Sequence, residues 1–209
     1  MIQIMDVHIS FGTEEVLHGI TKEFLPGKIH GIVGNNGSGK TVLMKCICGF
    51  LHPTSGKILV NQKEVGKDMD FPDSLGAMIE TPGFLPNLTG IKNLELLASL
   101  RGKIGKEEII QSLRRVGLDP ALKKGVGKYS LGMRQRLGIA QAIMENPDLL
   151  ILDEPFNGLD KDGVAQMRQL ILSLRSEGKT ILLASHSQLD IQLLCDTVCE
   201  MDAGNLVAT

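Results

Sequence analysis

The stretch Gly34-Asn35-Asn36-Gly37-Ser38-Gly39-Lys40-Thr41 decides how this chain folds. It matches the pattern G-x-x-x-x-G-K-S/T, and it lies between an apolar run at residues 29–33 and a helix-like run at residues 40–50. Glycines let the backbone close around phosphate oxygens, and the N-terminus of the following helix adds the positive end of its dipole. In this pattern Lys40 reaches the β- and γ-phosphates and the Thr41 hydroxyl can bind Mg²⁺. The stretch therefore predicts a strand–loop–helix unit that binds a polyphosphate.

Composition narrows the remaining choices. The chain has 209 residues, 43% of them hydrophobic, which suits one large domain with a buried core. A net charge of -2 gives no electrostatic reason to expect a nucleic-acid partner. No apolar run approaches the roughly 20 residues that span a bilayer, and the N-terminus does not resemble a signal peptide. We therefore expect a cytoplasmic protein, held at a membrane only through a partner.

The four cysteines match no trusted zinc spacing, and we expect them to be buried, reduced thiols. They are Cys46, Cys48, Cys195 and Cys199.

Hydrophobic periodicity divides the chain into strands and helices. Strands are expected at residues 1–9, 16–25, 28–33, 57–61, 75–79, 149–152 and 180–184, with a final hairpin over 197–208. Between Thr89 and Asn146 the period is helical, and a later helix is expected over 164–176. Two apolar helix faces are expected within residues 89–146. One is formed by Ile91, Leu94, Leu97 and Leu100, and the other by Ile109, Leu113 and Val116. This order predicts an α/β fold whose mainly parallel core sheet carries an N-terminal antiparallel β subdomain and an inserted α-helical subdomain at about 89–146.

A second motif lies at the end of the apolar run 149–152, where Asp153 and Glu154 follow. A buried parallel strand delivers such carboxylates to the sheet edge at which ligands bind. Asp153 suits Mg²⁺ through its water shell, and Glu154 suits the orientation or deprotonation of an attacking water. An ordinary strand that ends in surface acids is the alternative, and the phosphate-binding stretch makes it less favoured.

The third motif is Tyr129-Ser130-Leu131-Gly132-Met133-Arg134-Gln135-Arg136. Alone it predicts a helix start with Ser130 as its cap. Together with the other two motifs it resembles the L-S-G-G-Q signature of ATP-binding-cassette (ABC) ATPases, and the resemblance covers essentially the whole chain. It implies a P-loop NTPase fold, with residues 1–209 forming one nucleotide-binding domain for ATP and Mg²⁺. In that family, Ser130 and Gly132 would contact the γ-phosphate of an ATP held by a second copy.

The resemblance also assigns single residues. Phe11 falls where an aromatic ring stacks on adenine, although a core Phe at a strand end is an alternative. Val16 would line the same base. Asp160 matches the acidic residue of the family's dimer-contact loop. His186, just after the strand 180–184, matches the histidine that contacts the γ-phosphate. A lone His after a strand is more often structural, but its place 32 residues beyond Glu154 favours a functional role here.

Four positions depart from the family pattern. Glu80 stands where most relatives carry the Gln that links Mg²⁺ and the attacking water to the membrane partner. A carboxylate binds Mg²⁺ more strongly and adds charge near the polyphosphate, so Glu80→Gln should keep nucleotide binding but alter the Mg²⁺ dependence of hydrolysis. Leu131 and Met133 replace the usual Gly and Gln. Val42 replaces a hydroxyl residue, which removes one possible phosphate contact.

Glu80 and the Tyr-Ser-Leu-Gly-Met version of the signature resemble the bacitracin-type and lantibiotic-immunity exporters. Many of these continue well past the position of Thr209, so either this chain lacks that extension or it is part of a longer protein. The subgroup implies an ATPase that powers export of a peptide antibiotic or similar amphiphile. Its partners would be an integral membrane permease and a second nucleotide-binding subunit, and it would lie on the inner face of the cell membrane. A soluble ABC-type ATPase, for example in iron–sulfur assembly, and a non-catalytic nucleotide-gated regulator are the alternatives.

Overall fold

The core of the protein is a six-stranded sheet. In the computed structural model, which describes residues 1–80 and 83–207, the strand order is β10-β9-β3-β8-β7-β6, and only the β10–β9 pair is antiparallel. The strands are β3 (Ile29–Val33), β6 (Leu75–Met78), β7 (Leu149–Asp153), β8 (Thr180–Ala184), β9 (Thr197–Asp202) and β10 (Asn205–Val207). The predicted mainly parallel core sheet is therefore confirmed.

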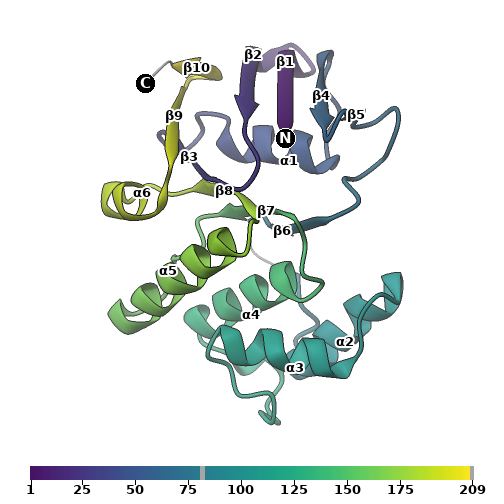
Figure 1. The fold of residues 1–209 in the computed structure, drawn as a ribbon, viewed down its shortest axis with the longest axis vertical. Helices are drawn as coiled ribbons and strands as arrows, with labels where there is room; N and C mark the ends of the chain where they lie inside the picture. Colours follow the sequence, from purple (N-terminus) through teal and green to yellow (C-terminus); the bar gives the residue numbers. More distant parts are fainter. Residues whose placement is uncertain (81–82, 208–209) are drawn as a thin grey trace.

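A second, antiparallel sheet of order β2-β1-β4-β5 forms one end of the molecule (Figure 1). Its strands are β1 (Ile2–Phe11), β2 (Glu14–Phe24), β4 (Ser55–Val60) and β5 (Lys63–Glu64). The predicted N-terminal antiparallel subdomain is confirmed, although β2 begins two residues before the predicted start and β5 was not predicted.

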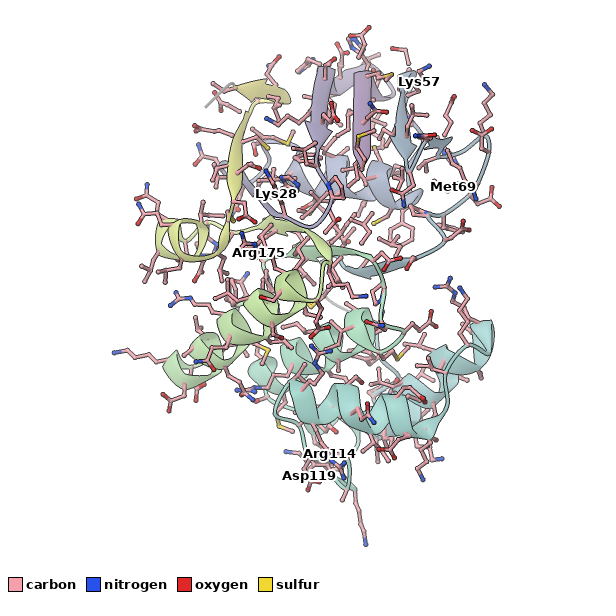
Figure 2. All side chains as sticks on the ribbon, in the orientation of Figure 1. Lys28, Lys57, Met69, Arg114, Asp119 and Arg175 are labelled. Atoms are coloured by element: carbon pink, nitrogen blue, oxygen red, sulfur yellow. The ribbon has the colours of Figure 1, made fainter. Side chains whose placement is uncertain are left out.

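Residues between Gly90 and Ile143 form the opposite, helical end of the molecule (Figure 1). They comprise α2 (Gly90–Arg101), α3 (Lys106–Arg115), the 3-10 turn η1 (Val126–Lys128) and α4 (Leu131–Ile143). In Figure 2, the labelled Arg114 and Asp119 lie at this helical end and Lys57 lies at the β-sheet end. The fold thus contains the inserted helical part that the sequence predicted.

Alternate residues of the central strands separate two hydrophobic cores. Leu150 and Leu152 of β7 pack with the helical end and with α5 (Lys161–Ser176). Leu149 and Ile151 pack with α1 (Lys40–Cys48) and the antiparallel sheet. Because successive side chains of a strand point to opposite faces, one fully buried strand serves both cores. The sheet is therefore packed on both faces, and this packing holds its carboxyl edge in place.

Two details of the helices differ from the prediction. Leu100 is 77% exposed, so its assignment to the buried face of α2 was wrong. The buried stripe of α2 passes through Gly90, Leu94 and Ala98 and includes the polar Asn93, which turns Leu100 to the outside. The short helix α6 (Gln188–Leu194) was not predicted, and it starts at Ser187, whose hydroxyl accepts a hydrogen bond from the Asp190 amide.

The cysteines lie in the interior, as expected. Cys46, Cys48 and Cys199 are buried and Cys195 is partly buried, and all four are free thiols. Burial raises the pKa of the Cys46 thiol to about 12, so this thiol stays protonated at neutral pH. Within residues 1–80 and 83–207, every helix is too short or too polar to cross a lipid bilayer.

Candidate nucleotide-binding site

The phosphate-binding loop connects β3 to α1, and its backbone requires glycine. Gly34 has φ 144° and Gly39 has φ 100°, in regions that favour glycine. A Cβ on Gly34 would lie 2.1 Å from the carbonyl oxygen of Met201, so the loop packs directly on the end of β9. The Gly204 amide also donates a hydrogen bond to the Ser38 carbonyl at 3.1 Å. The sheet and the closing hairpin therefore shape the loop together.

Lys40 and Ser38 place polar groups in this loop that can bind an anion. The buried Lys40 ammonium donates to the carbonyl oxygens of Gly34 at 2.7 Å and Asn35 at 2.8 Å, which holds it across the loop. The buried Ser38 hydroxyl has no hydrogen-bond partner among the described residues. A buried polar atom without a partner is costly, and a phosphate oxygen would satisfy it. These residues fit a phosphate group.

A hydroxyl and a carboxylate meet next to the loop. The Thr41 hydroxyl, in the first turn of α1, donates to Asp153 Oδ2 at 2.6 Å, at the end of β7. Hard oxygen ligands of this kind suit Mg²⁺, which keeps several waters and uses few protein ligands. The pair therefore fits the predicted metal, with Thr41 and Asp153 as the residues that would hold it.

Glu154 and His186 face each other one step further along the sheet edge. Asp153 of β7 lies opposite Ala184 of β8, so the residues that follow the two strands are neighbours. His186 Nδ1 lies 2.8 Å from Glu154 Oε2. Burial raises the pKa of the Glu154 carboxyl, although the nearby His186 opposes this shift. A carboxyl whose pKa is raised in a cleft is a candidate general base.

The backbone of Glu154 is held in an unusual conformation. Its φ is 50°, in the left-handed region that non-glycine residues rarely adopt. Its amide donates to the Ala184 carbonyl at 3.0 Å, and its own carbonyl accepts from Gln135 Nε2 at 2.8 Å. Surrounding contacts therefore fix where the carboxylate points. The sequence analysis assigned no role to Gln135, because its contact with Glu154 bridges two distant segments.

These residues line one cleft of about 660 Å³ at the carboxyl edge of the sheet. Its lining residues are Glu14, Val16, Asn36, Gly37, Gly39, Lys40, Thr41, Val42, Glu80, Leu131, Gln135, Asp153, Glu154 and Asn157. His186 lines the neighbouring hollow together with Gly34 and Asn35. Two residues were predicted to contact the base. Val16 lines the cleft, and Phe11 lies at the end of β1 with 51% of its surface exposed.

Ser130, Gly132 and Asp160 lie elsewhere. Together with Gly158 and Leu159 they line a separate hollow of about 340 Å³. The Ser130 hydroxyl caps α4 by accepting from the Met133 amide at 3.2 Å, and Asp160 caps α5 by accepting from the Gly163 amide at 2.9 Å. Ser130 and Gly132 are therefore not part of the phosphate-loop cleft of their own chain, although Leu131 and Gln135 of the same motif line it.

Lys45 is a further charged residue at this site that the sequence analysis did not identify. Its ammonium lies 2.7 Å from Glu80 Oε1. Lys45 is four residues after Thr41, so the two share a face of α1. This spacing is visible in the sequence, but the proximity of Glu80 to that face is not.

Comparison with known proteins identifies the class. The model of the family described as ABC transporter matches residues 17–157, and the chain belongs to this family. It is an ATP-binding subunit of the ABC transporter type, as the three motifs predicted.

Three known proteins illustrate the similarity. The chain is 41% identical to the bacitracin transport ATP-binding protein of Enterococcus faecalis, over 99% of this chain and 68% of that protein. It is 35% identical to the lantibiotic transport ATP-binding protein of Streptococcus pyogenes, over 99% of this chain and 89% of that protein. A bacterial ABC transporter cassette solved as a dimer shares the fold, with a TM-score of 0.89, 22% identity, and coverage of 100% of this chain and 97% of that one.

Proposed function

We propose that this chain hydrolyses ATP between two facing copies and thereby powers export of a peptide antibiotic or a similar amphiphile through a separate membrane subunit. One observation carries the proposal. The phosphate loop, the Thr41–Asp153 pair and the Glu154–His186 pair meet at one sheet edge, whereas Ser130 lies in a separate hollow. In this scheme the hollow of one copy lies over the cleft of another and completes the site.

Each residue of the cleft has a distinct part in this scheme. Lys40 and the loop amides would bind the β- and γ-phosphates, and Thr41 and Asp153 would hold the metal. When bound, Mg²⁺ neutralises charge on the phosphate oxygens. Glu154 directly follows Asp153, the last residue of β7, so its carboxylate lies beside the metal-binding pair. In this scheme it orients and deprotonates the attacking water. His186 keeps the Glu154 side chain in place through the 2.8 Å contact.

The second copy contributes the start of α4. Ser130 and the amides at this helix N-terminus form a site for an anion, since N-terminal amides and the helix dipole favour negative charge. Gly132 is close-packed, because a Cβ there would lie 2.8 Å from the Gly158 carbonyl oxygen. ATP would then join two copies, and hydrolysis would separate them through charge repulsion in the interface.

The segment from Leu85 to Thr89 connects the proposed membrane contact to the signature. The Gly127 amide donates to the Pro86 carbonyl at 2.9 Å and the Val126 amide donates to the Leu88 carbonyl at 2.8 Å. Both donors lie in η1, immediately before Tyr129 and Ser130. A permease that moves this segment would therefore move the helix start that contacts the partner's nucleotide.

Apolar side chains are exposed in this segment and in the loop that precedes β6. Leu85 is 48% exposed, and Phe50 and Phe71, which are more than half exposed, contact each other with ring centroids 5.9 Å apart. Arg101, at the end of α2, donates to the Asp73 carbonyl at 2.8 Å, which brings the exposed Leu100 close to this side of the molecule. We assign this surface to the permease, which would keep the protein on the inner face of the membrane.

The names of the two relatives support the kind of cargo. One relative is named for bacitracin transport and the other for lantibiotic transport, and both cargoes are peptide antibiotics. In this scheme the permease would select the molecule. Co-purification from membranes with a tagged copy of this chain should identify that permease.

The hydrolysis step is tested with Glu154→Gln. We expect Mg²⁺-dependent release of phosphate from ATP by the unaltered protein, and a rate about 10²- to 10⁴-fold lower in Glu154→Gln, because the amide cannot accept the proton. Glu107→Gln, on the exposed first turn of α3, is the matched control and should hydrolyse ATP normally. Equal rates in Glu154→Gln and the unaltered protein would contradict the assigned role. If the unaltered protein shows no Mg²⁺-dependent hydrolysis, the alternative of a non-catalytic, nucleotide-gated regulator would be favoured.

A further inference from the structure

Lys45 contacts Glu80 at a position between the helix and the cleft. The Lys45 ammonium and Glu80 Oε1 are 2.7 Å apart, and the side chains are 28% and 62% exposed. Exposed ion pairs of this kind add little to folding stability. The pair therefore calls for an explanation other than stabilisation of the fold.

Sheet register explains why Glu80 lies near the reacting groups. Met78, the last residue of β6, lies opposite Leu152 of β7. Glu80 and Glu154 each follow two residues later, so both carboxylates belong to the same edge of the sheet. Glu80 lines the same cleft as Thr41, Asp153 and Glu154. Its carboxylate is thus near the metal-binding pair while it is bonded to Lys45.

Charge provides the reason for Lys45. Glu80, Asp153 and Glu154, together with Glu14, bring four carboxylates to a cleft in which Lys40 is the lysine of the lining. A triphosphate adds several negative charges, and like charges repel more strongly in a partly desolvated cleft. An uncharged Gln at position 80 would need no compensation, whereas Glu80 does. Lys45 supplies it one helical turn from Thr41.

We propose that Lys45 is a positioning residue that neutralises Glu80 and holds its carboxylate one helical turn away from the Thr41–Asp153 pair. Glu80 is then shared between Lys45 and the metal that accompanies the nucleotide. Lys45 therefore raises the affinity for the nucleotide and lowers the affinity with which Glu80 helps to bind the metal. This inference rests on the proposed nucleotide site.

The test measures binding in the Glu154→Gln background, where turnover does not interfere. Two readouts are used: ATP affinity in excess chelator, and the Mn²⁺ concentration that half-saturates the ATP complex, followed by electron paramagnetic resonance. With Glu80 present, Lys45→Gln should weaken metal-free ATP binding about two- to fivefold, and should lower the half-saturating Mn²⁺ concentration by a similar factor. Lys45→Arg should behave as the parent, because it keeps the charge.

The decisive comparison repeats Lys45→Gln in a Glu80→Gln chain, where both effects should disappear. Lys92→Gln breaks the exposed Lys92–Glu95 pair on α2, at 2.6 Å, and is the matched control with no expected effect. Effects of Lys45→Gln that are absent, or equal with and without Glu80, would overturn this inference alone. A parent protein that binds no ATP would overturn the proposed function and this inference with it.

Discussion

At the level of single residues, His186 acts on the chemistry of Glu154. Burial raises the pKa of the Glu154 carboxyl, and the imidazole 2.8 Å from its Oε2 lowers it again. Glu154 can accept a proton only when it is ionised. The hydrolysis rate should therefore fall as the pH decreases through a pKa above the value of about 4.3 of an exposed Glu.

His186→Ala should move this acid limb to higher pH, because the burial effect then acts without opposition. The maximal rate should also decrease, by about 10²-fold, since the Glu154 side chain loses its partner. The measurement is the pH dependence of kcat, with His52→Ala as a control outside the cleft. An acid limb that stays in place, or moves to lower pH, would show that His186 does not act on Glu154.

Ser130 has both a structural and a proposed functional part at the start of helix α4. Its hydroxyl caps the helix, and an Asp at an N-cap is as good an acceptor as Ser. The free energy of unfolding of Ser130→Asp should therefore lie within about 1 kcal/mol of that of the unaltered protein. Hydrolysis should decrease about 10²-fold, because the new carboxylate would face the phosphate of the partner's ATP.

Thr89→Asp is the matched control for this prediction. Thr89 caps α2 in the same way, by accepting from the Lys92 amide at 3.3 Å, and it lies outside the signature. In the isolated chain, without the permease, Thr89→Asp should change neither stability nor hydrolysis appreciably. If Ser130→Asp hydrolyses ATP at the normal rate, the hollow around Ser130 does not meet a nucleotide.

Elements were predictable where local pattern decides them. The fully buried runs of β7 and β8 form strands because they are short, apolar and β-branched or leucine-rich, and both were predicted. The face of α2 was not fully predictable. Four apolar residues suggested a stripe that includes Leu100, but Asn93 is buried instead, because its side chain bonds the segment at Leu85. Such a tertiary contact has no local signal.

The candidate site was predictable in part. Each motif contributes adjacent residues, so their grouping in one cleft follows from the sheet edge at which they lie. The Lys45–Glu80 and Gln135–Glu154 contacts join residues that are distant in the sequence, and only the folded chain reveals them. The separation of Ser130 from the cleft also needs the structure, although the family resemblance implied a second copy. The roles of these residues stay predictions.

At the scale of the whole molecule, the central claim is that ATP joins two copies of this chain. The cleft and the Ser130 hollow are separate hollows of one chain, and in this account each copy offers one half of each of two sites. Glu154→Gln should bind ATP without cleaving it and should accumulate the closed pair. Adding Ser130→Asp to Glu154→Gln should prevent pairing while the phosphate loop remains intact.

The most direct test is the molar mass of Glu154→Gln in solution, measured by light scattering with and without excess ATP. The account predicts a monomer of 22.6 kDa without nucleotide and twice that mass with ATP. A protein that binds ATP and stays monomeric at every concentration tested would contradict the claim.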